Sequence, residues 1–260
     1  MHPVFVAFGQ YQVPSYVVGQ IAAIVTVAFY AHHRRRQVQL PASIGLDLGL
    51  IVLAAILFGG RLEWLRQTGT ELTMASAWWI ATRGGFSFFG VLAIALPATA
   101  LYARRHGLPV LSFWDALVPA LPLGLAVYRL GCVAAGCCYG TPCSLPWAIT
   151  YPDHPWTAAP AGIPLHPTPV YELLGSLVLF AVARHTRPSG GAAIAKVLAG
   201  FLVLRLAVDL GRGDSADRYL APDLLGPVLT QAQGWCLLGL AAIAAAAAFQ
   251  LRSAREVSHG

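Results

Sequence analysis

The sequence predicts an all-α, polytopic membrane protein with about seven transmembrane helices in a single integral membrane domain, residues 1–260. Hydrophobic residues make up 57% of the chain, charged residues 11%, and the mean hydropathy is +0.63. Soluble domains carry charge on roughly a quarter of their residues, so most of this chain cannot face water. The apolar runs are long and continuous, which favours helices over the alternating strands of a membrane β-barrel.

Seven apolar stretches are candidate spans. They are residues 16–30, 44–58, 86–102, 111–130, 170–183, 192–210 and 228–249. GGRLEW at 59–64 is expected to close the second span, and Pro119 and Pro122 fall within the fourth. Several stretches are near the lower length limit for a span. The polar, proline-rich residues 140–167 predict a small extramembrane cap.

The basic residues predict how the chain is oriented in the membrane. With the N-terminus outside and the C-terminus inside, the cytoplasmic segments hold ten of the 17 Lys and Arg residues and three of the 11 acids. These ten are Arg34, Arg35, Arg36, Arg104, Arg105, Arg184, Arg187, Lys196, Arg252 and Arg255. Cytoplasmic loops are enriched in Lys and Arg, so this orientation is favoured. The basic residues lie between apolar runs and not on one polar face, which argues against nucleic acid as a partner.

Arginines at the outer ends of the predicted spans need an explanation. These are Arg61, Arg129, Arg205 and Arg212. At about 1.5 Å per residue, Arg205 lies roughly 20 Å into its span, still at hydrocarbon depth. Asp209, one helical turn later, can pair with Arg205, whereas Arg129 has no acidic neighbour in sequence. Either these side chains extend to the headgroups, or they form a pocket for a phospholipid phosphate, which guanidinium groups bind in bidentate fashion.

The stretch YRLGCVAAGCCYG at 128–140 places Arg129 beside three thiols, Cys132, Cys137 and Cys138. On the oxidising outer face, a disulfide from Cys137 or Cys138 to Cys132 or Cys143 is one interpretation. Packing of small residues between helices is the alternative. A zinc site is not expected, because no paired ligand spacing is present.

Cys236 lies within an apolar helix and is expected to be structural. In RGGFSFFG at 83–90, the two glycines are expected to let neighbouring helices pack closely.

A further cluster, LHPTPVYELLG at 165–175, opens the fifth span. His166 carries protons at neutral pH, so it is a candidate base. Glu172 is either catalytic or a favourable acid at a helix N-terminus, and Tyr171 suits the membrane interface.

The order of these motifs resembles the prolipoprotein diacylglyceryl transferase family over almost the whole chain. The resemblance rests on GGR at 59–61, GGFSF at 84–88, WDALVP at 114–119, RLG at 129–131 and HPTPVYE at 166–172, followed by Arg205, Arg212 and Gln233. It implies a seven-helix enzyme of the bacterial inner membrane with a periplasmic cap at 140–167 and no cofactor. Such an enzyme moves diacylglyceryl from phosphatidylglycerol to the lipobox cysteine thiol of a preprolipoprotein and releases glycerol phosphate.

The resemblance also implies roles for individual residues. Phospholipid binding falls to Arg129 and Arg205, and the matching motif residues are Tyr16, Arg61, Asp115, His166, Tyr171, Glu172, Arg212 and Gln233. The family's asparagine and glutamate after RLG are Cys132 and Cys137 here. Its histidine after GGFSF is Phe89, and its tyrosine one turn before the sixth-helix arginine is Phe201.

Two hypotheses follow. The first is a lipid–thiol transferase in which catalysis falls to His166, Glu172, Cys137 or Cys132, and phospholipid is bound by Arg129, Arg205, Arg61, Arg212, Tyr16 and Gln233. The second is a relative that binds phospholipid and uses Cys132, Cys137 and Cys138 in another thiol-based or redox role.

Overall fold

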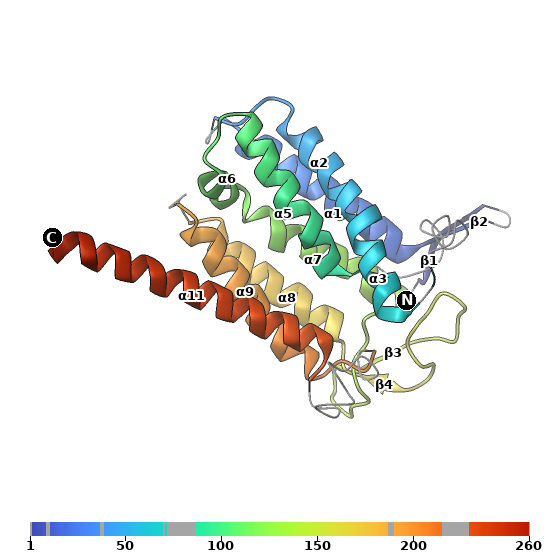
Figure 1. Cartoon of the computed structure of the whole chain (residues 1–260). Helices are drawn as coiled ribbons and strands as arrows, with labels where there is room; N and C mark the ends of the chain where they lie inside the picture. The colour runs from blue at the N-terminus through green and yellow to red at the C-terminus, as the bar shows by residue number, and fades with distance from the viewer. Residues whose placement is uncertain are drawn as a thin grey trace.

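Helices dominate the computed structural model, which describes residues 2–8, 11–36, 39–69, 71, 87–186, 190–214 and 229–259 (Figure 1). The helices are α1 (Ser15–Arg34), α2 (Ile44–Ala54), α3 (Arg61–Thr68), α5 (Phe88–Arg105), α6 (Val110–Leu117), α7 (Ala120–Ala135), α8 (Thr168–Ala183), α9 (Ala192–Asp209) and α11 (Gln231–His259). A π-helical turn, η1 (Ala55–Gly60), joins α2 to α3. The strands are β1 (Val4–Phe8), β2 (Tyr11–Pro14), β3 (Ile149–Thr150) and β4 (Pro164–Leu165).

Four described helices are long and apolar enough to cross a membrane, or five if the bent pair α6 and α7 forms one span. The four are α1, the continuous helix at 44–68, α5 and the first part of α11. Helices also occupy the other two predicted spans: α8 has 16 residues and α9 has 18, with Lys196, Arg205 and Asp209 among them. The chain is thus a helical, multi-pass membrane protein, whereas seven spans and their orientation remain predictions.

The helix of the second predicted span does not end at GGRLEW, residues 59–64. Both glycines are helical, and the helix continues through η1 into α3 as far as Thr68. Glycine weakens a helix, but here tertiary packing outweighs that preference. A Cβ atom on Gly59 would collide with the carbonyl oxygen of Gly90 in α5, so the glycines let these two helices touch.

The fourth predicted span is broken at its prolines. Helices α6 and α7 meet at an angle of 42° around Val118 and Pro119. Asp115, near the end of α6, is 1% exposed and accepts hydrogen bonds from the backbone N–H groups of Gly191 and Ile194, both at 2.8 Å. These are N–H groups at the start of α9 that no helical carbonyl can satisfy. The Asp115 carboxylate of α6 therefore caps the start of α9.

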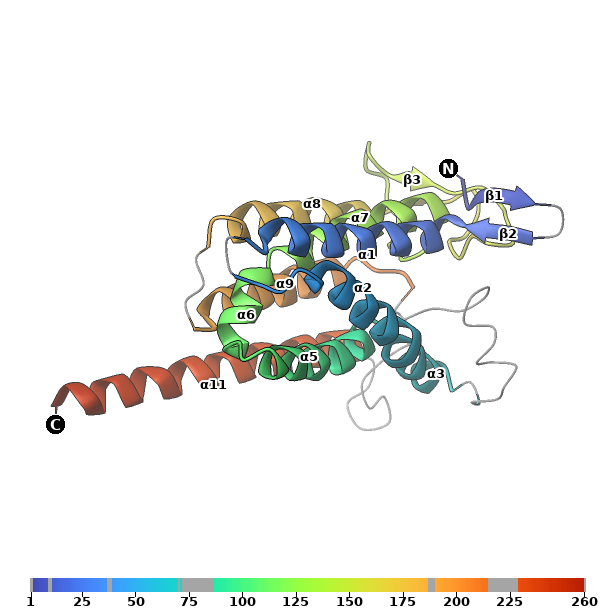
Figure 2. The ribbon, with the colours of Figure 1, turned by 90° about the horizontal axis from the view of Figure 1, so that it is seen from above.

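Packing places α1, α7 and α8 side by side, with α9 and α11 paired and α5 against η1 (Figure 2). Helices α1 and α7 also approach closely, and a Cβ atom on Gly19 would lie 2.8 Å from the Cα of Gly131. Gly131 lies between Arg129 and Cys132 in the sequence. This contact therefore fixes the end of α7, which carries both residues, against α1.

The cap segment at 140–167 carries a two-stranded antiparallel sheet, β3 with β4, around a small core of Tyr151, Ala159 and Leu165. A second hairpin, β1 with β2, precedes α1 and was not predicted. The indole Nε1–H of Trp156 donates to the Gln12 side-chain oxygen at 2.5 Å, so the hairpin and the cap segment are in contact.

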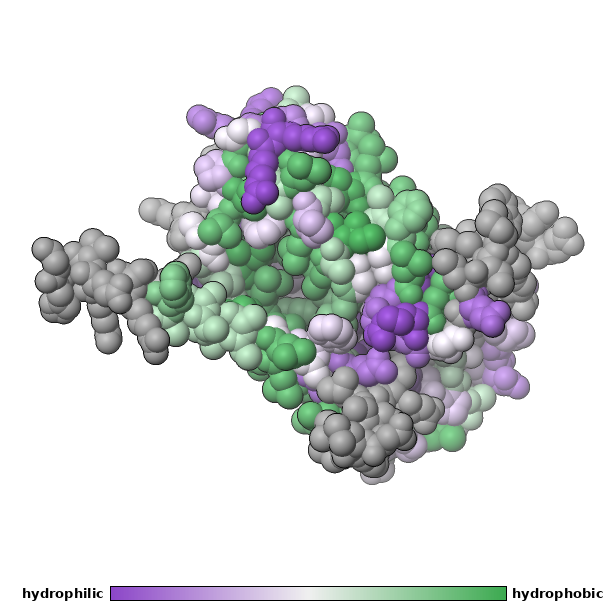
Figure 3. All heavy atoms as spheres, in the orientation of Figure 1, coloured by the Kyte–Doolittle hydropathy of each residue, from purple (hydrophilic) through white to green (hydrophobic). Residues whose placement is uncertain are grey.

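Apolar side chains cover the middle of the visible surface, and hydrophilic residues gather near the two ends of the helices (Figure 3). Large apolar side chains are strongly exposed, among them Phe29 at 71%, Val178 at 63% and Leu238 at 63%. Exposure of this kind is costly in water and normal against lipid.

Gly19→Ala is expected to destabilise the protein by about 1–3 kcal/mol, because the added methyl group overpacks the contact with Gly131. Gly49→Ala is the matched control, since its Cβ would meet Ala28 at an ordinary 3.6 Å. Thermal unfolding in detergent is the measurement. Equal midpoints for the two variants would contradict the close packing of α1 on α7.

Candidate functional site

The C-terminal end of α7 folds back on itself and gathers three thiols. Gly136 ends the helix with φ +70°, and the backbone N–H groups of Gly136 and Cys137 both donate to the carbonyl of Cys132, at 3.0 and 3.3 Å. A glycine in this left-handed conformation is a common helix terminator. The turn brings Cys137 and Cys138 back beside the last helical turn, where Cys132 lies.

Cys138 itself has φ +59°, which costs a non-glycine residue about 1–2 kcal/mol. Its carbonyl accepts a hydrogen bond from the Thr168 hydroxyl at 2.5 Å. A strained residue held by the neighbouring helix is typical of functional sites.

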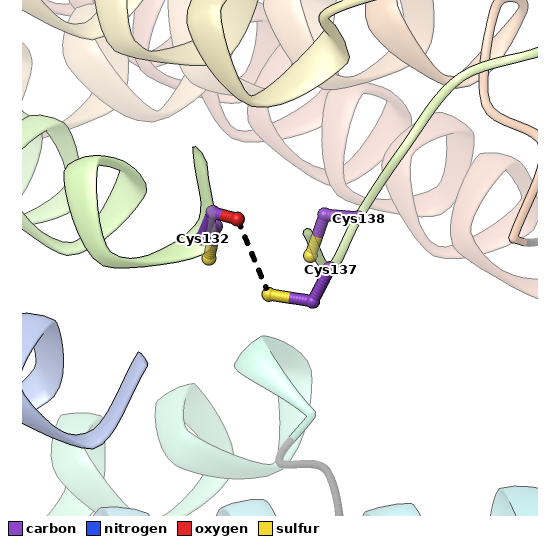
Figure 4. A group of neighbouring side chains, drawn as sticks. All are labelled: Cys132, Cys137 and Cys138. Carbon is purple, nitrogen blue, oxygen red and sulfur yellow. Dashed lines mark hydrogen bonds between the residues drawn. The ribbon is translucent and has the colours of Figure 1, made fainter. Parts of the chain in front are cut away.

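The sulfur atoms of Cys132, Cys137 and Cys138 all lie within 4.8 Å of one another (Figure 4). Nη1 of Arg129 donates to the sulfurs of Cys138 at 3.3 Å and Cys132 at 3.6 Å. All five cysteines are free, so the predicted disulfide is not present.

The carboxylate of Glu172 is shared by three arginines. Glu172, in α8, is 1% exposed. One of its oxygens pairs with Arg129 of α7, and the other lies 2.7 Å from Nη1 of Arg205 in α9 and 3.9 Å from Nη1 of Arg212. Glu172 lies outside the first turn of α8, so its interpretation as a helix N-terminal acid is wrong. Arg129 thus has an acidic partner that is distant in sequence.

Arg205 and Arg212 each pair with a second carboxylate as well. The predicted pair of Arg205 with Asp209 is confirmed at 2.9 Å, and Arg212 pairs with Asp214 at 2.6 Å. The side chains of Arg205 and Arg212 are 13% and 7% exposed. Arg61 is 4% exposed, with its guanidinium carbon 4.5 Å from the ring centre of Trp64. The alternative in which these side chains extend to the headgroups is therefore wrong.

Gln233 helps to begin α11. Its side-chain oxygen accepts a hydrogen bond from the backbone N–H of Thr230, and the Thr230 hydroxyl oxygen accepts one from the N–H of Gln233, both at 3.1 Å. This reciprocal pattern is a capping box. The Thr230 hydroxyl also donates to Asp209 at 2.6 Å, so the start of α11 is tied to the arginine cluster.

A cavity of about 300 Å³ lies between α1, the helix at 44–68, α5, α7, α9 and α11. Most of its wall is apolar, and its cationic side chains are Arg129, Arg205 and Arg212, with Cys138 beside them. The hollow between α5 and α11 in Figure 3 lies on this side of the bundle.

Two residues that depart from the family pattern, Phe89 and Phe201, also line this cavity. Each packs against a further aromatic ring: Phe89 on Trp235 at 6.4 Å and Phe201 on Phe88 at 4.9 Å between ring centres. An aromatic wall therefore occupies the places expected to hold a histidine and a tyrosine. Of the glycine motif at 83–90, residues 83–86 lie outside the described residues.

Several predicted site residues do not line the cavity: Tyr16, Arg61, Cys132, Cys137, His166, Glu172 and Gln233. His166 contacts the Tyr171 hydroxyl at 3.3 Å, which in turn accepts a hydrogen bond from Trp147 at 2.9 Å. Cys138, which was not among the predicted catalytic residues, does line it. Its adjacency to Cys137 in sequence gave no indication of which thiol would face inward.

The surroundings of Cys138, which lies in the turn after α7, favour the thiolate form of its side chain. Hydrogen bonds from Cys132 and Cys137, together with the guanidinium groups of Arg212 and Arg129, hold the pKa of Cys138 well below its usual value despite burial. Hydrogen bonds with Cys132 and Cys138, and then burial, raise the pKa of Cys137. Burial of Arg212 lowers its pKa, but Cys138, Asp214 and Glu172 outweigh this effect and raise it.

The sequence as a whole matches a known family at residues 3–249, described as prolipoprotein diacylglyceryl transferase. The chain belongs to the prolipoprotein diacylglyceryl transferase family. Relatives named phosphatidylglycerol–prolipoprotein diacylglyceryl transferase include that of Azoarcus sp., 33% identical over 90% of this chain and 89% of the relative. The protein of Bordetella avium is 33% identical over 64% of this chain and 63% of its own length. That of Chromohalobacter salexigens is 34% identical over 69% of this chain and 66% of its own length.

Glu172→Gln is expected to destabilise the protein by about 3–5 kcal/mol, because buried arginines lose their shared counter-ion. Glu63→Gln is the control: Glu63 pairs with Arg66, whose side chain is 58% exposed, and such a pair contributes about 0–1 kcal/mol. Thermal unfolding of both variants in detergent checks this. If Glu172→Gln lowers the unfolding midpoint no more than Glu63→Gln does, the role of the shared carboxylate is refuted.

Proposed function

We propose that this chain is a phosphatidylglycerol–prolipoprotein diacylglyceryl transferase of the bacterial inner membrane. Two findings support the proposal: membership of the family over residues 3–249, and three arginines in the wall of an otherwise mostly apolar cavity. The cavity suits a substrate with an anionic phosphate and apolar acyl chains. Its position near the hollow between α5 and α11 is consistent with entry of a lipid from the side of the bundle.

The arginines suit the leaving group of this reaction. The acceptor sulfur attacks the glyceryl carbon, the bond from that carbon to the phosphate oxygen breaks, and the electron pair leaves with glycerol phosphate. Guanidinium groups held in position before the reaction stabilise this charge as it develops. Arg129 offers a donor for this purpose, because its buried Nε has no hydrogen-bond partner among the described residues.

Glu172 acts in this proposal as the counter-ion that holds the arginines, not as the base. Its carboxylate is shared between Arg129 and Arg205, which stabilises its charged form and disfavours proton uptake. Arg129, Arg205 and Arg212 are the phosphate ligands. Arg61, Tyr16 and Gln233 support the walls, since they do not line the cavity.

The finer topology also belongs to the proposal. We take α8 and α9 as the remaining two of seven spans, with the N-terminus and the cap at 140–167 in the periplasm. The exposed Arg104 and Arg105 at the end of α5 would then face the cytoplasm, as basic residues favour.

The closeness of the three sulfurs favours one alternative, a family member that binds phospholipid but uses Cys132, Cys137 and Cys138 for redox chemistry. The two candidates differ in one observable. A redox protein would cycle these thiols without any diacylglyceryl transfer.

Transfer is tested with the full chain in phosphatidylglycerol vesicles and a lipobox peptide that contains one cysteine. The expected result is a peptide heavier by one diacylglyceryl group, with glycerol phosphate released. Arg205→Ala is expected to lower the rate about 10²–10³-fold, since one preformed donor to a developing oxyanion is worth that much. Arg66→Ala, at an exposed position outside the cavity, is expected to keep the rate. A folded wild-type chain that yields no product would sink the proposal.

The same question can be asked in cells. Expression of this chain in a bacterium depleted of its own diacylglyceryl transferase is expected to restore growth, whereas the Arg205→Ala chain is not. Normal membrane insertion without rescue by the wild type would favour the redox alternative.

A further inference from the structure

The three thiols beside the cavity have no role in the proposed reaction so far. Cys132, Cys137 and Cys138 come from one helix end and the turn after it, and their sulfurs face a common small space (Figure 4). Thiol packing alone does not require three sulfurs within 4.8 Å of one another or a strained backbone at Cys138.

The spacing of the sulfurs fits a metal ion. Two thiolates each bound at about 2.3 Å to a tetrahedral zinc ion lie roughly 3.8 Å apart. Sulfurs within 4.8 Å of one another reach that geometry with side-chain shifts of about 1 Å or less. A zinc site with three protein ligands keeps a fourth position open, which is the arrangement of catalytic sites.

The surroundings provide hydrogen bonds suited to metal-bound thiolates. Arg129 already donates to the sulfurs of Cys132 and Cys138 at 3.6 and 3.3 Å. Polar partners of this kind orient the ligands of a metal and tune its chemistry. Three thiolates and one zinc ion carry a net negative charge, so the nearby guanidinium of Arg129 compensates the site and does not oppose it.

The cap segment covers the turn that carries these cysteines with the side chains of Tyr151 and Thr157. The ring of Tyr151 and the methyl group of Thr157 lie 2.8 and 2.7 Å from where a Cβ on Gly136 would be, next to Cys137. Tyr151 is 2% exposed, and neither its hydroxyl nor that of Thr157 has a hydrogen-bond partner among the described residues. The cap segment therefore packs directly over the turn that carries Cys137, and it brings two buried hydroxyl groups that have unused hydrogen-bonding capacity.

We propose that Cys132, Cys137 and Cys138 bind one zinc ion whose open position takes the thiol of the acceptor cysteine. This inference rests on the proposed transferase function. Zinc is the ion of choice because thiolates bind it strongly and it has no redox chemistry of its own. Cys138 lines the cavity, so an acceptor that enters the cavity reaches the ion from the side of the phosphate ligands.

The acceptor thiol binds zinc as a thiolate and loses its proton to water. Its sulfur then forms a bond to the glyceryl carbon as the bond from that carbon to the phosphate oxygen breaks. The electron pair leaves with glycerol phosphate, and the neutral thioether, a weaker ligand than a thiolate, leaves the zinc. The ion thus supplies a nucleophile at neutral pH in a site where Phe89 stands at the family's histidine position.

The test begins with metal content, which does not depend on activity. The purified full chain is expected to hold one zinc ion by mass spectrometry of metals, and cobalt in its place is expected to give thiolate-to-cobalt charge-transfer absorption. Serine substitution of Cys132, Cys137 or Cys138 is expected to weaken zinc binding by more than the 10–100-fold typical of partners outside the ligand set. Cys143→Ser and Cys236→Ser are the matched controls and are expected to bind zinc as the wild type does.

Activity is then compared before and after a chelator removes zinc. Transfer is expected to fall at least about 100-fold and to return with zinc but not magnesium. Transfer by a zinc-free chain, zinc retained after all three serine substitutions, or a disulfide within the trio would each overturn the inference and leave the transferase proposal standing. Zinc bound by the trio in a folded chain without transfer would support the site and refute the proposed function instead.

Discussion

The site depends on the ion pairs that the buried carboxylate of Glu172 forms with arginines of neighbouring helices. It joins α8 to Arg129 in α7, to Arg205 in α9 and, more distantly, to Arg212 after α9. Charges away from water are tolerated only when they are paired, so these helices cannot separate without leaving a buried ion alone. The same requirement fixes the cations at one wall of the cavity. Asp209 and Asp214 then neutralise the outer sides of Arg205 and Arg212.

In the proposed function, this arrangement lets an apolar protein bind a phosphate. Free arginines in a membrane would have to be desolvated when the substrate arrived, whereas arginines that are already paired have been desolvated during folding. In the proposed reaction the phosphate meets donors in fixed positions, which is the condition for stabilising charge in a transition state. The turn after α7 is preorganised in the same way. The Gly136 cap and the Thr168 hydrogen bond place the cysteines against Arg129 before any substrate binds.

The sequence predicted those features that depend on neighbours along the chain. Apolar runs located the helices of the seven predicted spans, and the spacing of Arg205 and Asp209 predicted their pair. Features that depend on tertiary contact escaped prediction. Gly59 and Gly60 continue a helix because Gly90 lies against it, and the partner of Arg129 lies in a different helix. Gln233 matched the family motif, yet its side-chain oxygen serves the start of α11, and nothing in the spacing of the cysteines showed that three sulfurs would meet.

We propose above that arginines held by Glu172 bind the phosphate of the lipid substrate. A crystal structure of the full chain grown from a lipid phase that contains phosphatidylglycerol tests it most directly. The account predicts a lipid phosphate within hydrogen-bond distance of Arg129, Arg205 or Arg212, with Glu172 still paired to Arg129 and Arg205. A headgroup bound elsewhere, with the three arginines contacting only their carboxylates, would contradict it.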